Sequence, residues 1–291
     1  MQRRMFNRRI LFTLIILMFA LLVACDSTQS NQPLATEEPG VVATAVPEES
    51  NEDVGQEEEA TEAEHIVHWS YEGEGDPAHW AELDAAYEAC GLGLEQSPID
   101  LTGSTAVDLV NIAFAYAESN VNIFNNGHTI QVNYDEGSSI DVGGHVYNLR
   151  QFHFHAPSEH ALDGAMYPLE MHLVHADAED NLAVVGVFVT EGEENPAFAP
   201  VWADLPVEET EAQVTGMLVN AVDFLPTEQV FYRYNGSLTT PPCSEGVLWS
   251  VMAAPVEMSA EQIAAFTTIF EGNNRPLQPL NDRELELDET P

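Results

Sequence analysis

Histidines gather at two places in this chain, and their spacing points to a shared site. The stretch QFHFHAPSEH places His153 and His155 in alternation with phenylalanines. In a β-strand, that alternation directs both imidazoles to one face. A second run, LEMHLVHAD, contains His172, seventeen residues after His155. This interval leaves room for a strand reversal, so an antiparallel neighbour would bring His172 opposite the pair.

Three neutral imidazoles without a thiolate match a catalytic zinc site with an open fourth position. A metal-bound imidazole also needs an acceptor at its other ring nitrogen. Gln151 stands two residues before His153, and Glu170 stands two residues before His172, each on the strand face of its histidine. The pattern therefore predicts one zinc ion with two orienting partners. The alternative is two unrelated groups of hydrogen-bonded histidines.

A rival metal motif overlaps the same stretch. HFHAPSE fits H-x-H-x3-E, which resembles the first metal motif of cupins and would make Glu159 a ligand of iron or manganese. Cupins then place a glycine seven residues after the glutamate, whereas Gly164 follows Glu159 by five. Their second motif, with a histidine and an asparagine behind Pro-x-Gly, is not apparent. We therefore favour the zinc site.

Charge restricts the partners of this protein. The 291-residue chain has a formal net charge of −41 and contains no lysine. From His65 onward, 37 acidic residues accompany four arginines, which gives −33 with histidine neutral. So negative a domain argues against nucleic acid and against anionic lipid as a partner.

The N-terminus has the pattern of an export signal. Four arginines precede ILFTLIILMFALLVA, fifteen residues that are too few for a comfortable membrane span. The sequence LVAC then resembles the lipobox of bacterial lipoproteins, with Cys25 as the lipidated residue. We expect residues 1–24 to be a signal peptide and the protein to sit on the outer side of the cytoplasmic membrane. An ordinary signal peptide and an uncleaved anchor are the alternatives.

Residues 25–64 are predicted to be a disordered tether, because residues 26–64 hold twelve acids, no basic residue and no aromatic residue. With Cys25 taking lipid, Cys90 and Cys243 remain. Two cysteines in an exported chain indicate one disulfide, with two free buried thiols as the alternative.

Residues 65–291 are predicted to form a single sheet-dominated domain with peripheral helices. Short alternating or apolar runs recur between turn sequences such as NNGH, DEGSS and VGGH. Two segments have helical patterns, DPAHWAELDAAYEAC at 76–90 and MSAEQIAAFTTIF at 258–270. In the second, Ser259 as N-cap and Gln262 complete a capping box.

With these residues in view, the sequence resembles the α-class carbonic anhydrases. The resemblance runs in order from about residue 67 to 287. It includes HWSY, QSPIDL, NNGHTI, QFHFHAPSEH, EMHLVHAD, YNGSLTTPPCSEGVLW and NNRPLQPL. It implies one domain around a large, twisted, mostly antiparallel (mixed) sheet, with zinc at the bottom of a conical cleft.

The resemblance also assigns roles to residues of this chain. His153, His155 and His172 would bind zinc, and the backbone carbonyl of Asn273 would hold His155. Thr239 would act as a gatekeeper that accepts a hydrogen bond from zinc-bound hydroxide and donates its own proton toward Glu159. The residues that would order water in the cleft are Tyr71, Asn126 and Gln131. Those that would line the substrate pocket are Val174, Val184, Leu238, Thr240, Val247 and Trp249. The resemblance also implies a disulfide between Cys90 and Cys243, a pairing similar to that of exported bacterial members of the family.

The implied activity is hydration of carbon dioxide to bicarbonate and a proton by zinc hydroxide. Direct proton release to water would limit turnover to ~10²–10³ s⁻¹, given an acidity constant of ~10⁻⁷ M and diffusion-limited recombination. Carbonic anhydrase, itself the standard example of this chemistry, reaches ~10⁶ s⁻¹. A proton shuttle is therefore needed, and His128 is the candidate.

The resemblance further implies inhibition by sulfonamides and anions, and exported bacterial relatives are often homodimers. The alternative function is a catalytically weak binding module on the same fold. His160, the last residue of QFHFHAPSEH, receives no assignment beyond a structural one.

Overall fold

Strands with alternating side chains form one large sheet in a computed structural model that describes residues 67–290. The expected signal peptide, Cys25, the whole expected tether and its boundary at residue 65 lie outside the described residues. The strands are β1 (Thr105–Ala106), β2 (Ile112–Ala115), β3 (Glu118–Asn125), β4 (Ile130–Asn133), β5 (Ser139–Val142), β6 (His145–His155), β7 (Leu169–Ala176), β8 (Leu182–Glu191), β9 (Gln213–Asn220), β10 (Phe231–Ser237), β11 (Glu245–Met258) and β12 (Glu286–Asp288).

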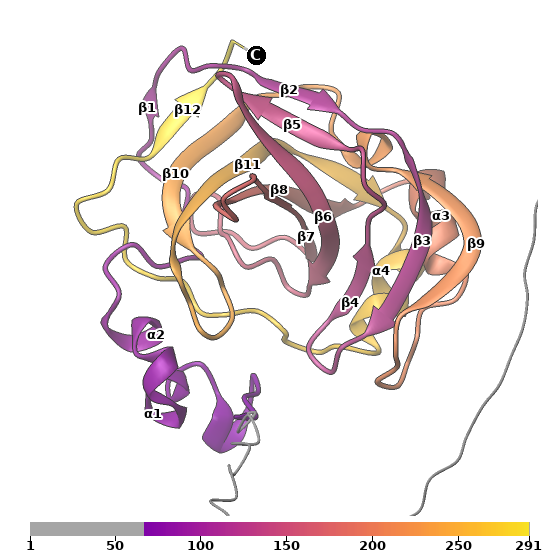
Figure 1. The fold of residues 1–291 in the computed structure, drawn as a ribbon, viewed down its shortest axis with the longest axis horizontal. Helices are drawn as coiled ribbons and strands as arrows, with labels where there is room; N and C mark the ends of the chain where they lie inside the picture. Colours follow the sequence, from indigo (N-terminus) through magenta and orange to yellow (C-terminus); the bar gives the residue numbers. More distant parts are fainter. Residues whose placement is uncertain (1–66, 291) are drawn as a thin grey trace, which may run out of the picture. The chain divides into compact units, whose positions relative to one another are not determined.

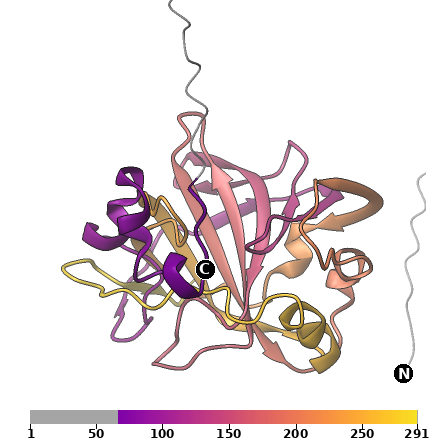
Figure 2. The same cartoon turned by 90° about the horizontal axis from the view of Figure 1, so that it is seen from below.

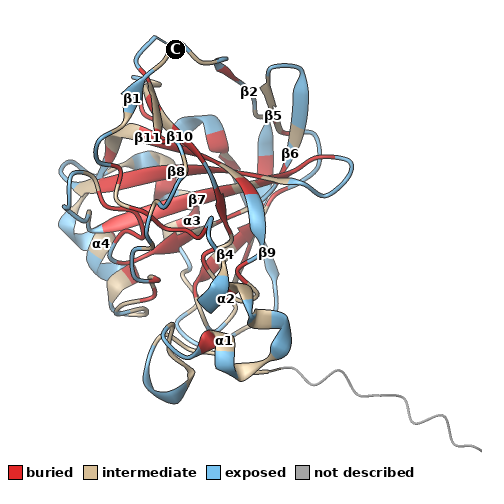
Figure 3. Ribbon diagram, turned by 90° about the vertical axis from the view of Figure 1, so that its left-hand side faces the viewer, coloured by how far each residue is buried: buried red, intermediate tan, exposed pale blue. Residues whose placement is uncertain are grey.

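The sheet has twelve strands, ten of them in the order β1-β12-β10-β11-β8-β7-β6-β4-β3-β9, with β5 joining β2 to β6. The pairs β8–β11 and β1–β12 are parallel, and the other pairs are antiparallel. The predicted mixed, mostly antiparallel sheet is therefore confirmed. The strands curve around the middle of the described domain (Figure 1), and the buried residues concentrate on β7 and β8 (Figure 3).

Short helices lie at the periphery of the sheet (Figure 2). They are η1 (Gly73–Gly75), α1 (Trp80–Leu83), η2 (Ala85–Tyr87), α2 (Ala89–Leu92), η3 (Pro196–Phe198), α3 (Ala199–Trp202), η4 (Ala221–Phe224) and α4 (Ala260–Thr267). The predicted capping box of α4 is present, with Ser259 and Gln262 satisfying each other's backbone. Among the described helices, none is long and apolar enough to span a membrane.

The single helix expected over 76–90 is wrong, because the segment breaks into α1, η2 and α2. Asp84 causes the break by adopting an extended backbone at φ −152° and ψ 147°. Its carboxylate accepts a hydrogen bond from the Ala86 amide and so caps the next turn. A side chain that can bond its own backbone competes with a continuous helix in this way.

Buried His175 on β7 makes the stability of the fold depend on pH. It is fully buried, with Nε2 2.8 Å from the Tyr116 hydroxyl and Nδ1 3.2 Å from the Ala183 carbonyl oxygen. Burial lowers the pKa of His175 to about 4. The ordinary histidine pKa in the unfolded chain is about 6.5. Between pH 6.5 and 4, the unfolded chain therefore binds a proton at His175 that the folded chain does not bind.

The free energy of unfolding should consequently fall as pH drops through 6.5 and level off near 4, by about 3 kcal/mol from this group alone. We expect about 2 kcal/mol of that loss between pH 7 and pH 5. Urea titrations of chelator-treated protein at both pH values would measure it. His175→Gln, which keeps polar atoms beside Tyr116, should show a smaller loss than the parent. Equal losses in the two proteins would contradict the assignment.

Candidate metal centre

Strand register brings the two histidine runs together. His153 on β6 pairs directly with His172 on β7, and His155 pairs with Glu170. The opposite face of β6 carries Phe152 and Phe154, both fully buried in the main core. The period-two alternation thus separates a packed face from a face of imidazoles, as predicted.

In each of the three imidazoles, one ring nitrogen lies within hydrogen-bond distance of an oxygen acceptor. His153 Nδ1 lies 2.8 Å from Gln151 Oε1, and His155 Nδ1 lies 2.6 Å from the Asn273 carbonyl oxygen. His172 uses Nε2, which lies 3.0 Å from Glu170 Oε1. One nitrogen from each histidine of the group lies within 4.8 Å of the others. A metal ion between them would find three nitrogens already oriented.

Burial favours the neutral, metal-binding form of His153 and His155. Desolvation lowers the pKa of His153 well below its ordinary value, and the nearby His155 and His172 add to that effect. Burial likewise lowers the pKa of His155. His155 Nε2 is fully buried and has no hydrogen-bond partner among the described residues. An unpartnered buried nitrogen in a group of neutral imidazoles fits a divalent cation such as zinc.

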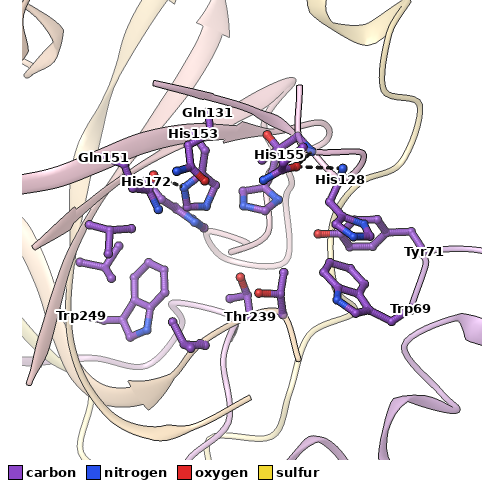
Figure 4. Close-up of a pocket in the computed structure, with 16 residues that line it drawn as sticks. Trp69, Tyr71, His128, Gln131, Gln151, His153, His155, His172, Thr239 and Trp249 are labelled. Atoms are coloured by element: carbon purple, nitrogen blue, oxygen red, sulfur yellow. Dashed lines mark hydrogen bonds between the residues drawn. The ribbon is translucent and has the colours of Figure 1, made fainter. Parts of the chain in front are cut away.

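A cavity of about 160 Å³ opens in front of this histidine group. Trp249 lies on one side of the group, and Tyr71, Trp69 and His128 lie on the other (Figure 4). The lining also includes the remaining predicted cleft residues, namely Asn126, Gln131, Gln151, Val174, Val184, Leu238, Thr239 and Thr240. The cavity therefore combines an apolar wall with a polar, aromatic one.

Val247 is the predicted pocket residue that does not line this cavity. It is only 2% exposed and packs in the second hydrophobic cluster with Val184 and Trp249. Strand β11 directs Trp249 toward His172, at 4.8 Å between ring centroids, and Val247 packs in the same cluster as Trp249.

Glu159 lies beside the histidines, but its expected bond to Thr239 is missing. Its Oε1 accepts a hydrogen bond of 2.9 Å from the Arg275 amide. Its Oε2 is buried without a partner among the described residues, 3.6 Å from His155 Nε2 and 3.8 Å from His172 Nδ1. Thr239 lines the same cavity. Thus Glu159 carries an open acceptor at the edge of the group.

His128 lies at the polar side of the cavity, stacked on Trp69 with ring centroids 3.7 Å apart and planes 8° apart. It is half-buried, and burial lowers its pKa, with His68 contributing and Glu209 opposing. Asn126 Oδ1 accepts the amide hydrogens of His128 and Thr129, which fixes the turn that presents the imidazole. The imidazole lies beside Trp69 and Tyr71, on the side of the histidine group away from Trp249 (Figure 4).

Sequence reasoning missed the role of His160. Its Nδ1 lies 2.8 Å from Glu170 Oε1, and its Nε2 lies 2.6 Å from the Tyr234 hydroxyl. The amide hydrogens of Glu159 and His160 are donated to Glu170 Oε2. Burial opposes ionisation of Glu170, but the partners His160 and His172 hold its pKa well below the usual range. Spacing alone gives no signal for this network.

Arg275 links the site to the Cys90–Cys243 disulfide, whose predicted pairing is confirmed. Its buried guanidinium donates to the carbonyl oxygens of Cys90 and Ser97 and to Gln96 Oε1. Its amide holds Glu159, and Gln96 also donates to the Cys243 carbonyl oxygen. The disulfide therefore braces the turn that carries Thr239 and Thr240.

Comparison with known proteins agrees with this geometry. The family model of eukaryotic-type carbonic anhydrases matches residues 75–288. The carbonic anhydrase of Pectobacterium carotovorum is 44% identical over 218 residues, covering 75% of this chain and 89% of that protein. The α-carbonic anhydrase of Thermovibrio ammonificans, solved with the inhibitor sulfanilamide, superposes with a TM-score of 0.74 at 43% identity, covering 76% of this chain and 99% of the other.

A further solved structure, dioscorin complexed with ascorbate, superposes with a TM-score of 0.71 at 28% identity, covering 77% of this chain and 99% of that one. The same fold therefore also occurs in a protein solved with an organic acid.

Proposed function

This chain belongs to the eukaryotic-type, or α, carbonic anhydrase family of enzymes, and we propose that it hydrates carbon dioxide at a zinc ion held by His153, His155 and His172. The observation that carries the zinc assignment is the group of three imidazole nitrogens within 4.8 Å at the base of a cavity. A zinc ion held by these three imidazoles would supply Lewis-acid chemistry, lowering the pKa of water at the open position to about 7.

The residues around the group have complementary tasks in this proposal. Gln151, Glu170 and the Asn273 carbonyl fix the ring orientations of the three ligands. The wall of Val174, Val184, Leu238 and Trp249 receives a small, uncharged, apolar substrate. Thr239 and the open Oε2 of Glu159 would orient the attacking oxygen. Tyr71, Asn126 and Gln131 provide the polar side, where water can be ordered.

The decisive experiment combines metal analysis with stopped-flow hydration of carbon dioxide. We expect one zinc per chain, hydration activity, and loss of that activity with a sulfonamide or an inhibitory anion. Protein with neither zinc nor activity would instead support the binding-module alternative.

His128 should carry the proton out of the site. His128→Ala is expected to slow hydration at least about tenfold in dilute, non-penetrating buffer, because direct release to water is limited to ~10²–10³ s⁻¹. Added imidazole should restore the rate, because free imidazole gains and loses a proton near neutral pH and can replace the missing side chain as proton acceptor. Zinc content should not change. An unchanged rate in the variant would remove His128 from the mechanism.

We also propose that the protein is exported and held by lipid at Cys25, on the outer side of the cytoplasmic membrane. The support is the charged and apolar N-terminal sequence ending in LVAC. Cys25→Ala should move the protein from the membrane fraction to the soluble fraction while leaving its hydration activity intact. Continued membrane association would contradict lipid anchoring.

A further inference from the structure

A second cavity, of about 340 Å³, lies at β10, away from the histidine group. In the sheet, β11, β8 and β7 separate β10 from β6 (Figure 1). The cavity contains both signs of charge and an apolar part. Its lining is Glu95, Leu109, Arg233, Tyr234, Asn235, Leu248, Arg283, Glu284 and Glu286.

Arg233 is the unusual member of this lining. It is only 9% exposed, and of its three guanidinium nitrogens only Nε donates a hydrogen bond, to Ser250 Oγ at 3.0 Å. Its Nη2 is buried without a partner among the described residues. Glu286 pairs with Arg233 across β10 and β12, and Asp288 lies two residues further along β12, yet neither carboxylate comes within the 4.0 Å of an ion pair. A buried cation in this state gains from any ligand oxygen that reaches it.

Arg283, by contrast, is already satisfied. Its guanidinium donates to the carbonyl oxygens of Leu280, Asn235, Gln96 and Pro279. Its carbon lies 5.5 Å from the centroid of the Tyr234 ring. Arg283 therefore supports the cavity and adds positive charge, whereas Arg233, which packs over the Phe231 ring, has guanidinium donors that no described residue accepts.

The carboxylates decide between two kinds of ligand. Glu95 and Glu284 are exposed, Glu286 is half-buried, and none forms an ion pair with an arginine among the described residues. A simple anion such as bicarbonate would meet three like charges. A molecule with a carboxylate at one end and an ammonium at the other would satisfy both sets.

We propose that this cavity binds a free amino acid, with the ligand carboxylate at Arg233, the ammonium group facing the glutamates, and an aliphatic side chain against Leu109 and Leu248. The arrangement uses the unpartnered arginine, the unpaired carboxylates and the apolar lining together.

Tyr234 connects this cavity to the candidate metal centre. Tyr234 is among the residues that line the cavity, and its buried hydroxyl lies 2.6 Å from His160 Nε2. His160 reaches Glu170, which in turn holds His172. A bound molecule that displaces Tyr234 would change the hydrogen bonds that orient His172, a proposed zinc ligand. The cavity would therefore act as a regulatory site. This regulatory role, unlike the binding site itself, rests on the proposed function.

Calorimetry with L-leucine, L-leucinamide and 4-methylpentanoate tests the binding site directly. Leucinamide lacks the carboxylate, and 4-methylpentanoate lacks the ammonium group. We expect leucine to bind at least about tenfold more tightly than either analogue. Equal binding of one analogue, or no binding of leucine at millimolar concentration, would overturn the proposal. Zinc-free protein serves equally well, so a failure here is distinct from a failure of the proposed function.

Two substitutions locate the site. Arg233→Gln should weaken leucine binding at least about tenfold, and Glu284→Gln, at an exposed position, should weaken it several-fold without changing the unfolding temperature. Glu261→Gln on α4 is the matched exposed control and should bind leucine normally. Normal binding by both cavity variants would place the ligand elsewhere and refute the assignment.

The regulatory role has its own measurement. Leucine should change the visible spectrum of cobalt-substituted protein, and Tyr234→Phe should abolish that change while retaining leucine binding. Binding without any spectral change would refute the coupling through Tyr234.

Discussion

Replacing His153 by alanine is expected to lower zinc affinity and carbon dioxide hydration by more than about 100-fold. Loss of an outer partner of a metal ligand already costs about 10–100-fold, and a ligand itself contributes more. Two imidazoles would remain, each oriented by its own acceptor, but the site would lose one of its three donors. His153 is the least buried of the three, so its removal disturbs the core least.

Zinc dissociation measured with a chromophoric chelator, together with stopped-flow hydration, would quantify both effects. The matched control is His145→Ala, an exposed histidine at the other end of the same strand β6. That variant should retain zinc and activity. If His153→Ala kept one zinc per chain at parental affinity, the proposed ligand set would be wrong.

Removing the Cys90–Cys243 disulfide is expected to cost about 5 kcal/mol of stability, the chain-entropy value for a loop closed over a sequence separation of 153 residues. We further expect activity to fall more than zinc content. The bridge ends in the turn that carries Thr239, where the Cys243 amide donates a hydrogen bond of 2.8 Å to the Thr240 carbonyl oxygen. Gln96 Nε2 braces the Cys243 carbonyl oxygen from the other side.

The double variant Cys90→Ala/Cys243→Ala avoids free thiols and tests this expectation. Urea titrations would measure its free energy of unfolding, and metal analysis would be made on the same sample as the hydration assay. Zinc should remain near one per chain because no zinc ligand is changed. Parental stability and activity in the double variant would show that the bridge has neither role.

The histidine group could be predicted from the sequence because period-two alternation assigns the strand face of each histidine and a seventeen-residue interval leaves room for the two strands to pair. His153 does pair with His172, as the spacing allows. The acceptors at Gln151 and Glu170 follow from the same alternation. Local patterns of this kind can be predicted from the sequence because each depends on only two neighbouring strands.

Side-chain contacts between segments far apart in the chain could not be predicted from the sequence in this way. The link from Arg275 to Cys90 spans 185 residues, and the bond between His160 and Tyr234 spans 74. Both are side-chain contacts inside the folded domain, where no periodicity applies. The family resemblance named Glu159 and Thr239 but not the open acceptor that Glu159 presents.

Some strands were missed for physical reasons of their own. Most residues of β9 are exposed, so its sequence lacks a clear apolar alternation, and Gly216 interrupts it with φ +78°. Strand β12 has only three residues and is defined by its partners β1 and β10. The glycine turn VGGH was recognised, but the four-residue strand β5 before it was not.

The inward position of the arginines among residues 67–290 has a consequence for resistance to proteolysis. Trypsin-like proteases cleave after lysine and arginine, and this chain has no lysine. Among residues 67–290, Arg233 and Arg275 are buried, Arg283 is half-buried, and Arg275 is followed by proline. Arg150 is the exposed arginine of this part of the chain, and it lies within strand β6, where the backbone is already hydrogen-bonded. The folded domain therefore offers such enzymes almost nothing to cut.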